Sequence, residues 1–326
     1  MNPSVSFTLS ACHTQTRLSA QVQSRTRSAK STNHADLHID FLLDGQPNKA
    51  FASKIQAFLG TLLLSFPFLN QYRWTIETSN SFPHSAGIAS SASSMSALAL
   101  CLCDIERQLL GTPDTEERFL RKASLIARLG SGSACRSIYP KAAIWGTSSE
   151  WADGINDYAV PFADTLHPTF VNYHDAILIV SRSEKVVSSR AGHALMENNP
   201  FAPVRYAQAR QHFAQLLPAL QNGDLACFIK IVEAEALALH ALMMTSEPSF
   251  ILMHPNSLQI IGLIRQFRQD TNIPVCFTLD AGPNIHLLYP EQYADDVKMF
   301  IETSLVQWCE NGEWIADQTG NIAKLA

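Results

Sequence analysis

The spacing of apolar residues changes repeatedly along this chain between the two-residue period of strands and the wider period of helices. Val5, Phe7 and Leu9 alternate with polar residues. The same criteria predict further strands at 18–22, 37–41, 72–77, 175–180, 275–280 and 285–289. They predict helices at 48–64, 90–110, 115–130, 203–220, 224–244, 256–269 and 291–303. Because strands and helices mix without strict alternation, we expect an α+β fold.

The length of the chain, 326 residues, suits two domains of ordinary size. Hydrophobic residues make up 46% and charged residues 16%, which favours a globular protein with a substantial core and excludes a disordered chain. The strand predicted at 175–180 opens a second half of the chain. We therefore place the domain boundary near residue 173 and expect domains of 1–173 and 174–326.

Charge and cysteine content narrow the class of protein. The 24 basic and 29 acidic side chains give a net charge of −5, whereas nucleic-acid-binding proteins more often carry a basic surplus, so we expect no nucleic-acid partner. The seven cysteines show no metal-ligand spacing and are interpreted as free thiols of a reducing cytoplasm. The first ten residues lack the features of a signal peptide, and the longest apolar stretch, 58–69, is too short to span a bilayer. We expect a soluble, cytoplasmic protein without membrane contact.

The first segment that carries chemistry is SFPHSAGIASSASSM, from Ser81 to Met95. A glycine among small residues before a helix lets backbone N–H groups approach an anion, and the helix N-terminus adds partial positive charge. This pattern suits a polyphosphate. A serine-rich helix cap followed by close helix packing is the alternative interpretation.

The second segment is RLGSGSACRSIY, from Arg128 to Tyr139. It places two glycines and three serines around Arg136, whose rigid fork of donors suits a carboxylate or a phosphate. The alternative is a glycine-rich connection in which the arginine pairs with a nearby carboxylate. Two segments suited to anions together favour a charged, phosphate-bearing substrate.

The third segment is FTLDAGPNI, from Phe277 to Ile285. We expect Asp280 to close an apolar strand just before Ala-Gly-Pro, where the sheet holds it in place as a base or a counter-charge. Taken alone, an aspartate that starts a turn is the simpler interpretation, because aspartate is common beside glycine and proline.

Taken in order, these segments resemble those of the mevalonate diphosphate decarboxylases, a family of the GHMP kinase superfamily. The family's loop of the type PxxAGLASSA is similar to PHSAGIASSA at Pro83–Ala92, and its GSGSACRS occurs unchanged at Gly130–Ser137. Its VSS motif resembles VSSR at Val187–Arg190, and its DAGPN occurs at Asp280–Asn284. The superfamily's kinases share the first loop, whereas GSGSACRS together with DAGPN marks the decarboxylase branch. The resemblance extends from about Pro3 to Tyr289.

The resemblance implies a fold and a reaction. The fold is the two-domain GHMP kinase fold, with an N-terminal domain like domain 2 of ribosomal protein S5 and a ferredoxin-like C-terminal domain. ATP phosphorylates the tertiary 3-hydroxyl of mevalonate 5-diphosphate, and loss of that phosphate and of CO₂ leaves isopentenyl diphosphate, a step of isoprenoid synthesis. Members are commonly homodimers, so a homodimer is expected.

It also implies roles for individual residues. Asp280 is expected at the 3-hydroxyl as the base or as the charge that orients it, and Arg136 at the substrate carboxylate. Substrate contacts are expected from Ser131 and Ser133. Contacts to the diphosphate are expected from Ser189 and Arg190. The loop residues expected at the ATP phosphates are Gly87, Ala89, Ser90 and Ser91, with Mg²⁺ held through those phosphates and by Ser91.

The sequence departs from the family pattern in two respects. It has no KYWGK-like motif, which in the family precedes the strand similar to NPSVSFTLS. His84 and His193 replace usual family residues, and we interpret them as polar replacements rather than proton-transfer groups. An active decarboxylase is therefore the preferred function. A related enzyme acting on mevalonate or its monophosphate, and a weakly active homologue that binds nucleotide, are the alternatives.

Overall fold

The computed structural model describes residues 2–22, 37–83, 88, 90–111, 115–183, 192 and 195–320. Contacts within the chain group it into two units, each assembled from separate segments. The larger unit comprises Met1–Cys12, Phe82–Ser90 and Tyr139–Ile322. The smaller unit comprises His13–Ser81, Ser91–Ile138 and Ala323–Ala326.

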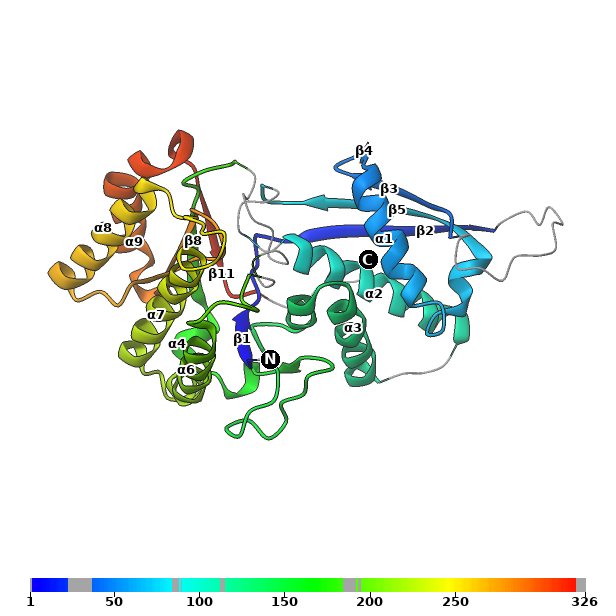
Figure 1. The fold of residues 1–326 in the computed structure, drawn as a ribbon, viewed down its shortest axis with the longest axis horizontal. Coiled ribbons are helices and arrows are strands. Elements are labelled where there is room, and N and C mark those ends of the chain that lie inside the picture. Colours follow the sequence, from blue (N-terminus) through cyan, green and yellow to red (C-terminus); the bar gives the residue numbers. More distant parts are fainter. Residues whose placement is uncertain are drawn as a thin grey trace. The chain divides into compact units, whose positions relative to one another are not determined.

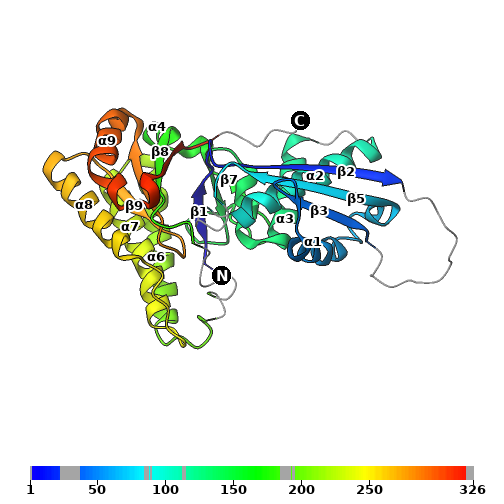
Figure 2. The ribbon, with the colours of Figure 1, turned by 90° about the horizontal axis from the view of Figure 1, so that it is seen from above.

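The smaller unit contains a four-stranded sheet in the order β2-β5-β3-β4, and Figures 1 and 2 both show its three long strands side by side. Its strands are β2 Thr14–Val22, β3 Ile39–Leu43, β4 Gln46–Pro47 and β5 Tyr72–Asn80. Strand β3 pairs with β5 in parallel, and the other pairs are antiparallel. Along β5, Trp74, Ile76 and Thr78 are buried while Arg73 and Glu77 are exposed, so one face of the sheet enters the core.

The helices of the smaller unit are α1 Lys49–Thr61, α2 Ser90–Leu110, which begins at the last residue of a larger-unit segment, α3 Glu116–Gly130 and the short helices η1 Pro67–Gln71 and η2 Gly132–Ile138. Their starts follow from local chemistry. The Asn48 side chain accepts a hydrogen bond from the Phe51 N–H, and Thr115 accepts one from the Arg118 N–H. Figure 1 shows α2 and α3 on one side of the sheet.

The larger unit contains two sheets. One has the order β1-β6-β7, built from β1 Ser4–Phe7, β6 Ala142–Trp145 and β7 Val160–Pro161. The other has the order β11-β8-β10-β9, built from β8 Tyr173–Leu178, β9 Cys276–Thr278, β10 Ile285–Pro290 and β11 Trp314–Gln318. All of these pairs are antiparallel.

The α-helices of the larger unit are α4 Pro168–Val171, α6 Ala202–Asn222, α7 Leu225–Met244, α8 Pro255–Thr271 and α9 Ala294–Phe300. Its short helical turns are η3 Ala163–Thr165, η4 Glu291–Tyr293, η5 Ile301–Leu305, η6 Val306–Trp308 and η7 Glu310–Gly312. Helix α6 ends at Gly223, whose φ of 76° is left-handed and whose added Cβ would lie 2.6 Å from the His167 ring. No helix within the described residues is both long and apolar enough to cross a membrane.

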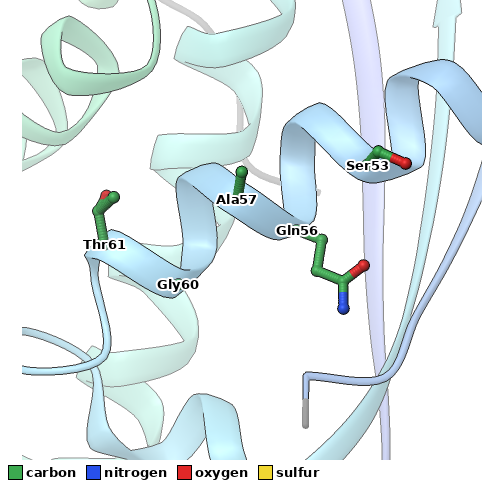
Figure 3. Close-up of a pocket in the computed structure, with 5 residues that line it drawn as sticks. All are labelled: Ser53, Gln56, Ala57, Gly60 and Thr61. Atoms are coloured by element: carbon green, nitrogen blue, oxygen red, sulfur yellow. The ribbon is translucent and has the colours of Figure 1, made fainter. Parts of the chain in front are cut away.

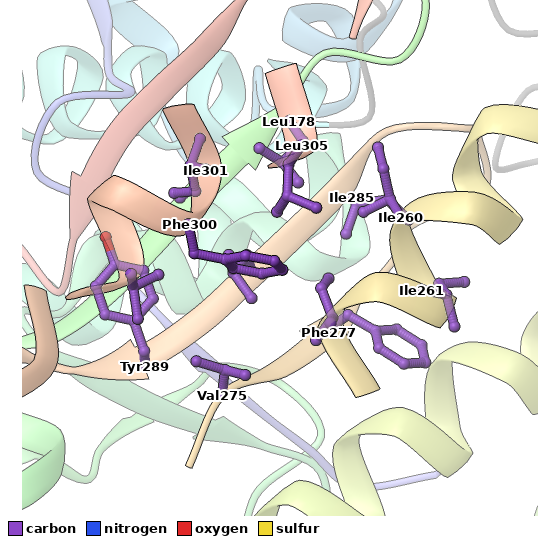
Figure 4. Close-up of a cluster of buried hydrophobic side chains, with 14 of the residues drawn as sticks. Leu178, Ile260, Ile261, Val275, Phe277, Ile285, Tyr289, Phe300, Ile301 and Leu305 are labelled. Carbon is purple, nitrogen blue, oxygen red and sulfur yellow. The ribbon is translucent and has the colours of Figure 1, made fainter. Parts of the chain in front are cut away.

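One face of the sheet β11-β8-β10-β9 is buried against α8, α9 and η5. Phe277, Ile285 and Leu178 come from the sheet, and Ile260, Phe300 and Leu305 come from the helical elements (Figure 4). Each of these side chains is almost fully removed from water, and burying one contributes roughly 1.5–3 kcal/mol. This core holds β9 and β10 in place, and the turn that contains Asp280 lies between them.

The structure corrects three expectations about elements. The strand predicted at 275–280 ends at Thr278, so Asp280 lies beyond the strand instead of closing it. The helix predicted at 291–303 is three short pieces, η4, α9 and η5. Strand β11 was not predicted, because its five residues, WIADQ, are too short for a clear alternating pattern and acquire their place by pairing with β8.

Candidate active site

The serine-rich segment ends at the start of α2. Ser90 and Ser91 are its first two residues; Ser90 is half-buried and Ser91 is exposed. The first N–H groups of a helix have no partner within it and carry partial positive charge, so this end of a 21-residue helix favours an anion. Gly87 and Ala89, predicted at the ATP phosphates, lie outside the described residues, as does His84.

The GSGSACRS segment forms the end of α3 and the 3₁₀ helix η2, where the sequence indicated a loop. Two buried hydroxyl groups hold it. Ser124, on α3, donates to the Cys135 carbonyl at 2.9 Å, and Ser96, on α2, lies 2.7 Å from the Ala134 carbonyl. Both serines are almost completely buried. The backbone of this turn is therefore fixed from two helices.

Ser131, Ser133 and Arg136 lie on or beside this fixed turn, and each is half-buried. The structure thus brings these three predicted residues together on one short element. Burial lowers the pKa of the Arg136 guanidinium from its ordinary value. Arginine still remains charged near neutral pH. A positive charge withdrawn from water attracts an anion more strongly than an exposed one, which suits a substrate carboxylate or phosphate.

The DAGPN turn is held at three points by three different elements. His240 Nε2, on α7, lies 3.2 Å from the Asp280 carbonyl oxygen. Ser257, on α8, donates to the Pro283 carbonyl at 2.6 Å. The Asn284 side chain accepts from the Ser181 N–H, just after β8, at 2.9 Å. None of these three bonds uses the Asp280 carboxylate, and Asp280 is half-buried. Three elements therefore hold the turn, two of them through its backbone carbonyls and one through the Asn284 side chain.

A buried ion pair lies on the same sheet. His286, on β10, approaches the Asp175 carboxylate, on β8, at 2.9 Å. Although burial acts to lower it, the nearby Asp175 carboxylate raises the pKa of His286. Asp317, opposite Asp175 on β11, accepts instead from the N–H groups of Ser10, Ala11 and Cys12. These bonds tie the chain after β1 to the sheet and satisfy a carboxylate that would otherwise repel its neighbour.

Two hollows lie away from the predicted residues. One, on α1, is lined by Ser53, Gln56, Ala57, Gly60 and Thr61, and Figure 3 shows these small or uncharged side chains along a single helix. The other, of about 310 Å³ within the larger unit, is lined mainly by apolar side chains of β1, α6, α7 and β10, together with His286 and Asp175. Neither includes Asp280, Arg136 or the serines predicted at the substrate.

Comparison with known proteins settles the family. The model of the diphosphomevalonate decarboxylase-like N-terminal domain matches residues 1–156, and that of the mevalonate 5-diphosphate decarboxylase C-terminal domain matches residues 176–323. The chain belongs to the mevalonate diphosphate decarboxylase family. The resemblance proposed from GSGSACRS and DAGPN is thereby confirmed.

Individual relatives agree with this assignment. The diphosphomevalonate decarboxylase of Eremothecium gossypii is 29% identical over 303 residues, which cover 88% of this chain and 70% of that protein. The diphosphomevalonate decarboxylase of Saccharomyces cerevisiae is 31% identical over 245 residues, covering 73% of this chain and 58% of that protein. The chain therefore spans less than two thirds of several curated relatives that it matches.

Solved structures of the family match almost the whole chain. Mevalonate diphosphate decarboxylase from Staphylococcus aureus superposes with a TM-score of 0.80 at 26% identity, covering 99% of this chain and 88% of that one. The complex of MDDEF with MVAPP, AMPPCP and magnesium gives a TM-score of 0.77 at 28% identity, covering 98% and 89%. These likenesses confirm the expected two-domain GHMP kinase fold.

Several residues that hold the two motifs were not singled out from the sequence. They are the buried polar residues Ser96, Ser124, His240 and Ser257, which bind backbone carbonyls of the two motifs. A polar residue at a position of the apolar helical stripe is the signal that could have revealed them, as in the run LALHALMM around His240. Ser189, Arg190 and His193 lie outside the described residues.

Proposed function

We propose that this chain catalyses the ATP-dependent decarboxylation of mevalonate 5-diphosphate to isopentenyl diphosphate through phosphorylation of the 3-hydroxyl. The observation that carries the proposal is the pair of family motifs with rigidly held backbones, GSGSACRS and DAGPN, in a chain that matches both domains of the family. The S. aureus and E. gossypii proteins above are named as decarboxylases of mevalonate diphosphate.

Asp280 acts at the phosphoryl-transfer step. The 3-hydroxyl oxygen attacks the γ-phosphorus of ATP, the bond to ADP breaks, and the hydroxyl proton passes to the Asp280 carboxylate or is oriented by it. The tertiary phosphate then leaves with the electrons of its C–O bond. The bond to the carboxyl carbon breaks to release CO₂, and its electrons form the new double bond.

The remaining substrate contacts come from the two groups predicted from the sequence. Arg136 pairs with the substrate carboxylate, as its desolvated guanidinium supports. Ser131 and Ser133 donate hydroxyl groups to the substrate. Ser189 and Arg190 bind the diphosphate.

ATP and Mg²⁺ are the co-substrate and the metal of this proposal. Ser90 and Ser91, at the N-terminus of α2, together with Gly87 and Ala89 before it, hold the ATP phosphates. Within the described residues, no three His, Cys, Asp or Glu side chains gather as a metal site. Mg²⁺ commonly binds through substrate phosphates with few protein ligands, so the phosphates and Ser91 are the ligands we propose.

The test is turnover by the purified protein with ATP, magnesium and mevalonate 5-diphosphate. We expect ADP and CO₂ to be released together, and ADP release to require the mevalonate compound. Formation of neither product, with the protein folded by circular dichroism, would refute the proposal.

A second candidate substrate is mevalonate 5-phosphate. The phosphomevalonate decarboxylase of Haloferax volcanii is 25% identical over 227 residues, covering 70% of this chain and 65% of that protein.

Substitution of Arg190 distinguishes the diphosphate from the monophosphate as the substrate. In a diphosphate enzyme, Arg190→Ala should raise KM for the diphosphate about tenfold or more while sparing the monophosphate, because a charge-assisted phosphate contact contributes about 1.5–3 kcal/mol. Arg182→Ala is the matched control, since Arg182 pairs with Glu313. Equal KM changes for both substrates in Arg190→Ala would favour the monophosphate.

Three further features belong to the same proposal. We place the domain boundary near residue 173, which the family models support because one ends at 156 and the other begins at 176. We assign the protein to the cytoplasm, which the seven free thiols, all within the described residues, support.

We also propose a homodimer, for which exposed Leu109 and Leu110 at the end of α2 offer apolar surface. Light scattering that gives the mass of one chain would refute the dimer.

A further inference from the structure

His240 is a buried histidine in the middle of an otherwise apolar stretch of α7. Its side chain is 1% exposed, and its neighbours in sequence are leucine and alanine. Its Nε2 lies 3.2 Å from the carbonyl oxygen of Asp280. A carbonyl oxygen only accepts hydrogen bonds, so Nε2 carries the proton and the tautomer of the ring is determined.

The other ring nitrogen, Nδ1, makes a buried histidine unfavourable for the stability of the fold. Nδ1 is buried, and it has no hydrogen-bond partner among the described residues. A buried polar atom without a partner is unfavourable, so a leucine would pack at this position with less penalty. Burial also lowers the pKa of His240, although the Asp280 carbonyl and carboxylate act to raise it, so the ring is neutral near pH 7. Packing alone therefore does not explain a histidine here.

The bond from His240 and the two other bonds that hold the DAGPN turn act on different residues of the turn. Ser257 holds the Pro283 carbonyl, and Asn284 holds the start of the segment after β8. Only His240, among these three, binds the peptide group of Asp280 itself. The two other anchors fix the end of the turn, while His240 fixes the residue whose carboxylate has to reach the reacting oxygen.

We propose that His240 is a positioning residue, a buried imidazole on α7 that fixes the peptide of Asp280 and, through it, the direction of the Asp280 carboxylate for phosphoryl transfer. The inference rests on the proposed function for its catalytic part and on the geometry of the turn for its structural part. His240 itself touches no reacting atom in this proposal.

Two substitutions separate positioning from folding. His240→Gln keeps an N–H donor close to the place of Nε2, whereas His240→Leu removes the donor and also removes the unpartnered Nδ1. We expect His240→Leu to remain folded by circular dichroism and to lose about 10- to 100-fold in kcat, with KM values within about threefold, because small misplacement of a reacting group has effects of this size. His240→Gln should retain most of the wild-type kcat.

A matched control removes a different buried bond just after the end of α7. Ser246 is 5% exposed and donates to the carbonyls of Met243 or Pro248, away from the DAGPN turn. Ser246→Ala should change stability without changing kcat. An equal loss of kcat in Ser246→Ala and His240→Leu would indicate general loosening of α7 and would overturn the proposal.

Hydrogen–deuterium exchange tests the anchor independently of activity. Amides of the segment 277–285 should exchange at least several-fold faster in His240→Leu than in the wild type, and at the wild-type rate in His240→Gln. Unchanged exchange in His240→Leu would refute the anchor. If exchange differs among the three proteins as expected but the wild type shows no turnover, the proposed function fails and the anchor remains. If turnover is present and His240→Leu keeps the wild-type kcat, the positioning role fails.

Discussion

Among single residues, Asp280 carries the central step of the proposed reaction. The residue is half-buried and lies beyond the end of β9, on a turn that α7 and α8 hold by backbone carbonyls and the segment after β8 holds through the Asn284 side chain. The Asp280 and Pro283 carbonyls and the Asn284 side chain are bonded to these elements, so the place of Asp280 is fixed by long-range contacts.

Replacing Asp280 by asparagine should preserve the shape of the turn and remove the negative charge. We expect kcat to fall by about 10²- to 10⁴-fold, the usual contribution of a positioned base. Affinities for ATP and for mevalonate 5-diphosphate should remain within about threefold, because the proposed base acts chiefly in the transition state. Calorimetric binding and steady-state kinetics measure the two effects separately. A parallel loss of binding and turnover would identify Asp280 as a structural residue.

Among the helices, close packing of the end of α3 against α1 and α2 fixes the position of the GSGSACRS turn. A Cβ at Gly130 would lie 2.6 Å from Met95 Sδ and 3.2 Å from Phe58 Cζ. The methionine can move, whereas the buried ring of Phe58 yields less. Only glycine permits this contact without rearrangement, so close packing requires the glycine at the start of the motif.

Gly130→Ala should therefore destabilise the protein by about 1–3 kcal/mol through overpacking. Gly262→Ala is the matched control, because Gly262 is in α8 and its added Cβ would meet no atom within 4 Å. That substitution should stabilise by about 0.5–1 kcal/mol, since alanine loses less backbone entropy in a helix. Urea unfolding of both variants provides the comparison. A Gly130→Ala protein as stable as Gly262→Ala would contradict the packing described.

The His286–Asp175 pair links β8 to β10 and makes a prediction about pH. The ordinary pKa of the histidine is 6.5, and Asp175 raises it in the folded protein. The folded state then binds the proton more tightly than the unfolded state, so the pair stabilises fully below about pH 6.5 and less as pH rises through the folded pKa. The stability difference between wild type and His286→Gln should shrink between pH 6 and pH 9. Chemical unfolding at a series of pH values measures it, and a difference that grows with pH would be contrary to expectation.

At the scale of the whole molecule, the fold class and both family motifs were predictable from the sequence, and the supports of the motifs were not. Helix α2 was predicted with the bounds that it has, Ser90–Leu110, because its apolar spacing is regular over many turns. Strand β11 was missed because its position depends on pairing with β8. His240 was missed because its partner is 40 residues further along the chain, a distance over which local patterns carry no information.

The residues of the candidate site were likewise only partly predictable from the sequence. Short segments with special backbone needs, such as GSGSACRS and DAGPN, are recognisable because few residue types satisfy them. The hydroxyl groups of Ser96 and Ser124 look like ordinary helix residues until the fold brings a carbonyl to each. Sequence therefore predicted which groups meet the substrate, and that remains a proposal, whereas the structure was needed to find what holds the two motifs.

The coupling of ADP release to decarboxylation is the sharpest test of the proposed reaction. A single turnover of the purified protein with ATP, magnesium and mevalonate 5-diphosphate labelled in the carboxyl carbon should yield one labelled CO₂ for each ADP, and Asp280→Asn should yield neither at a comparable rate. Release of ADP without labelled CO₂, or of labelled CO₂ without ADP, would contradict the account.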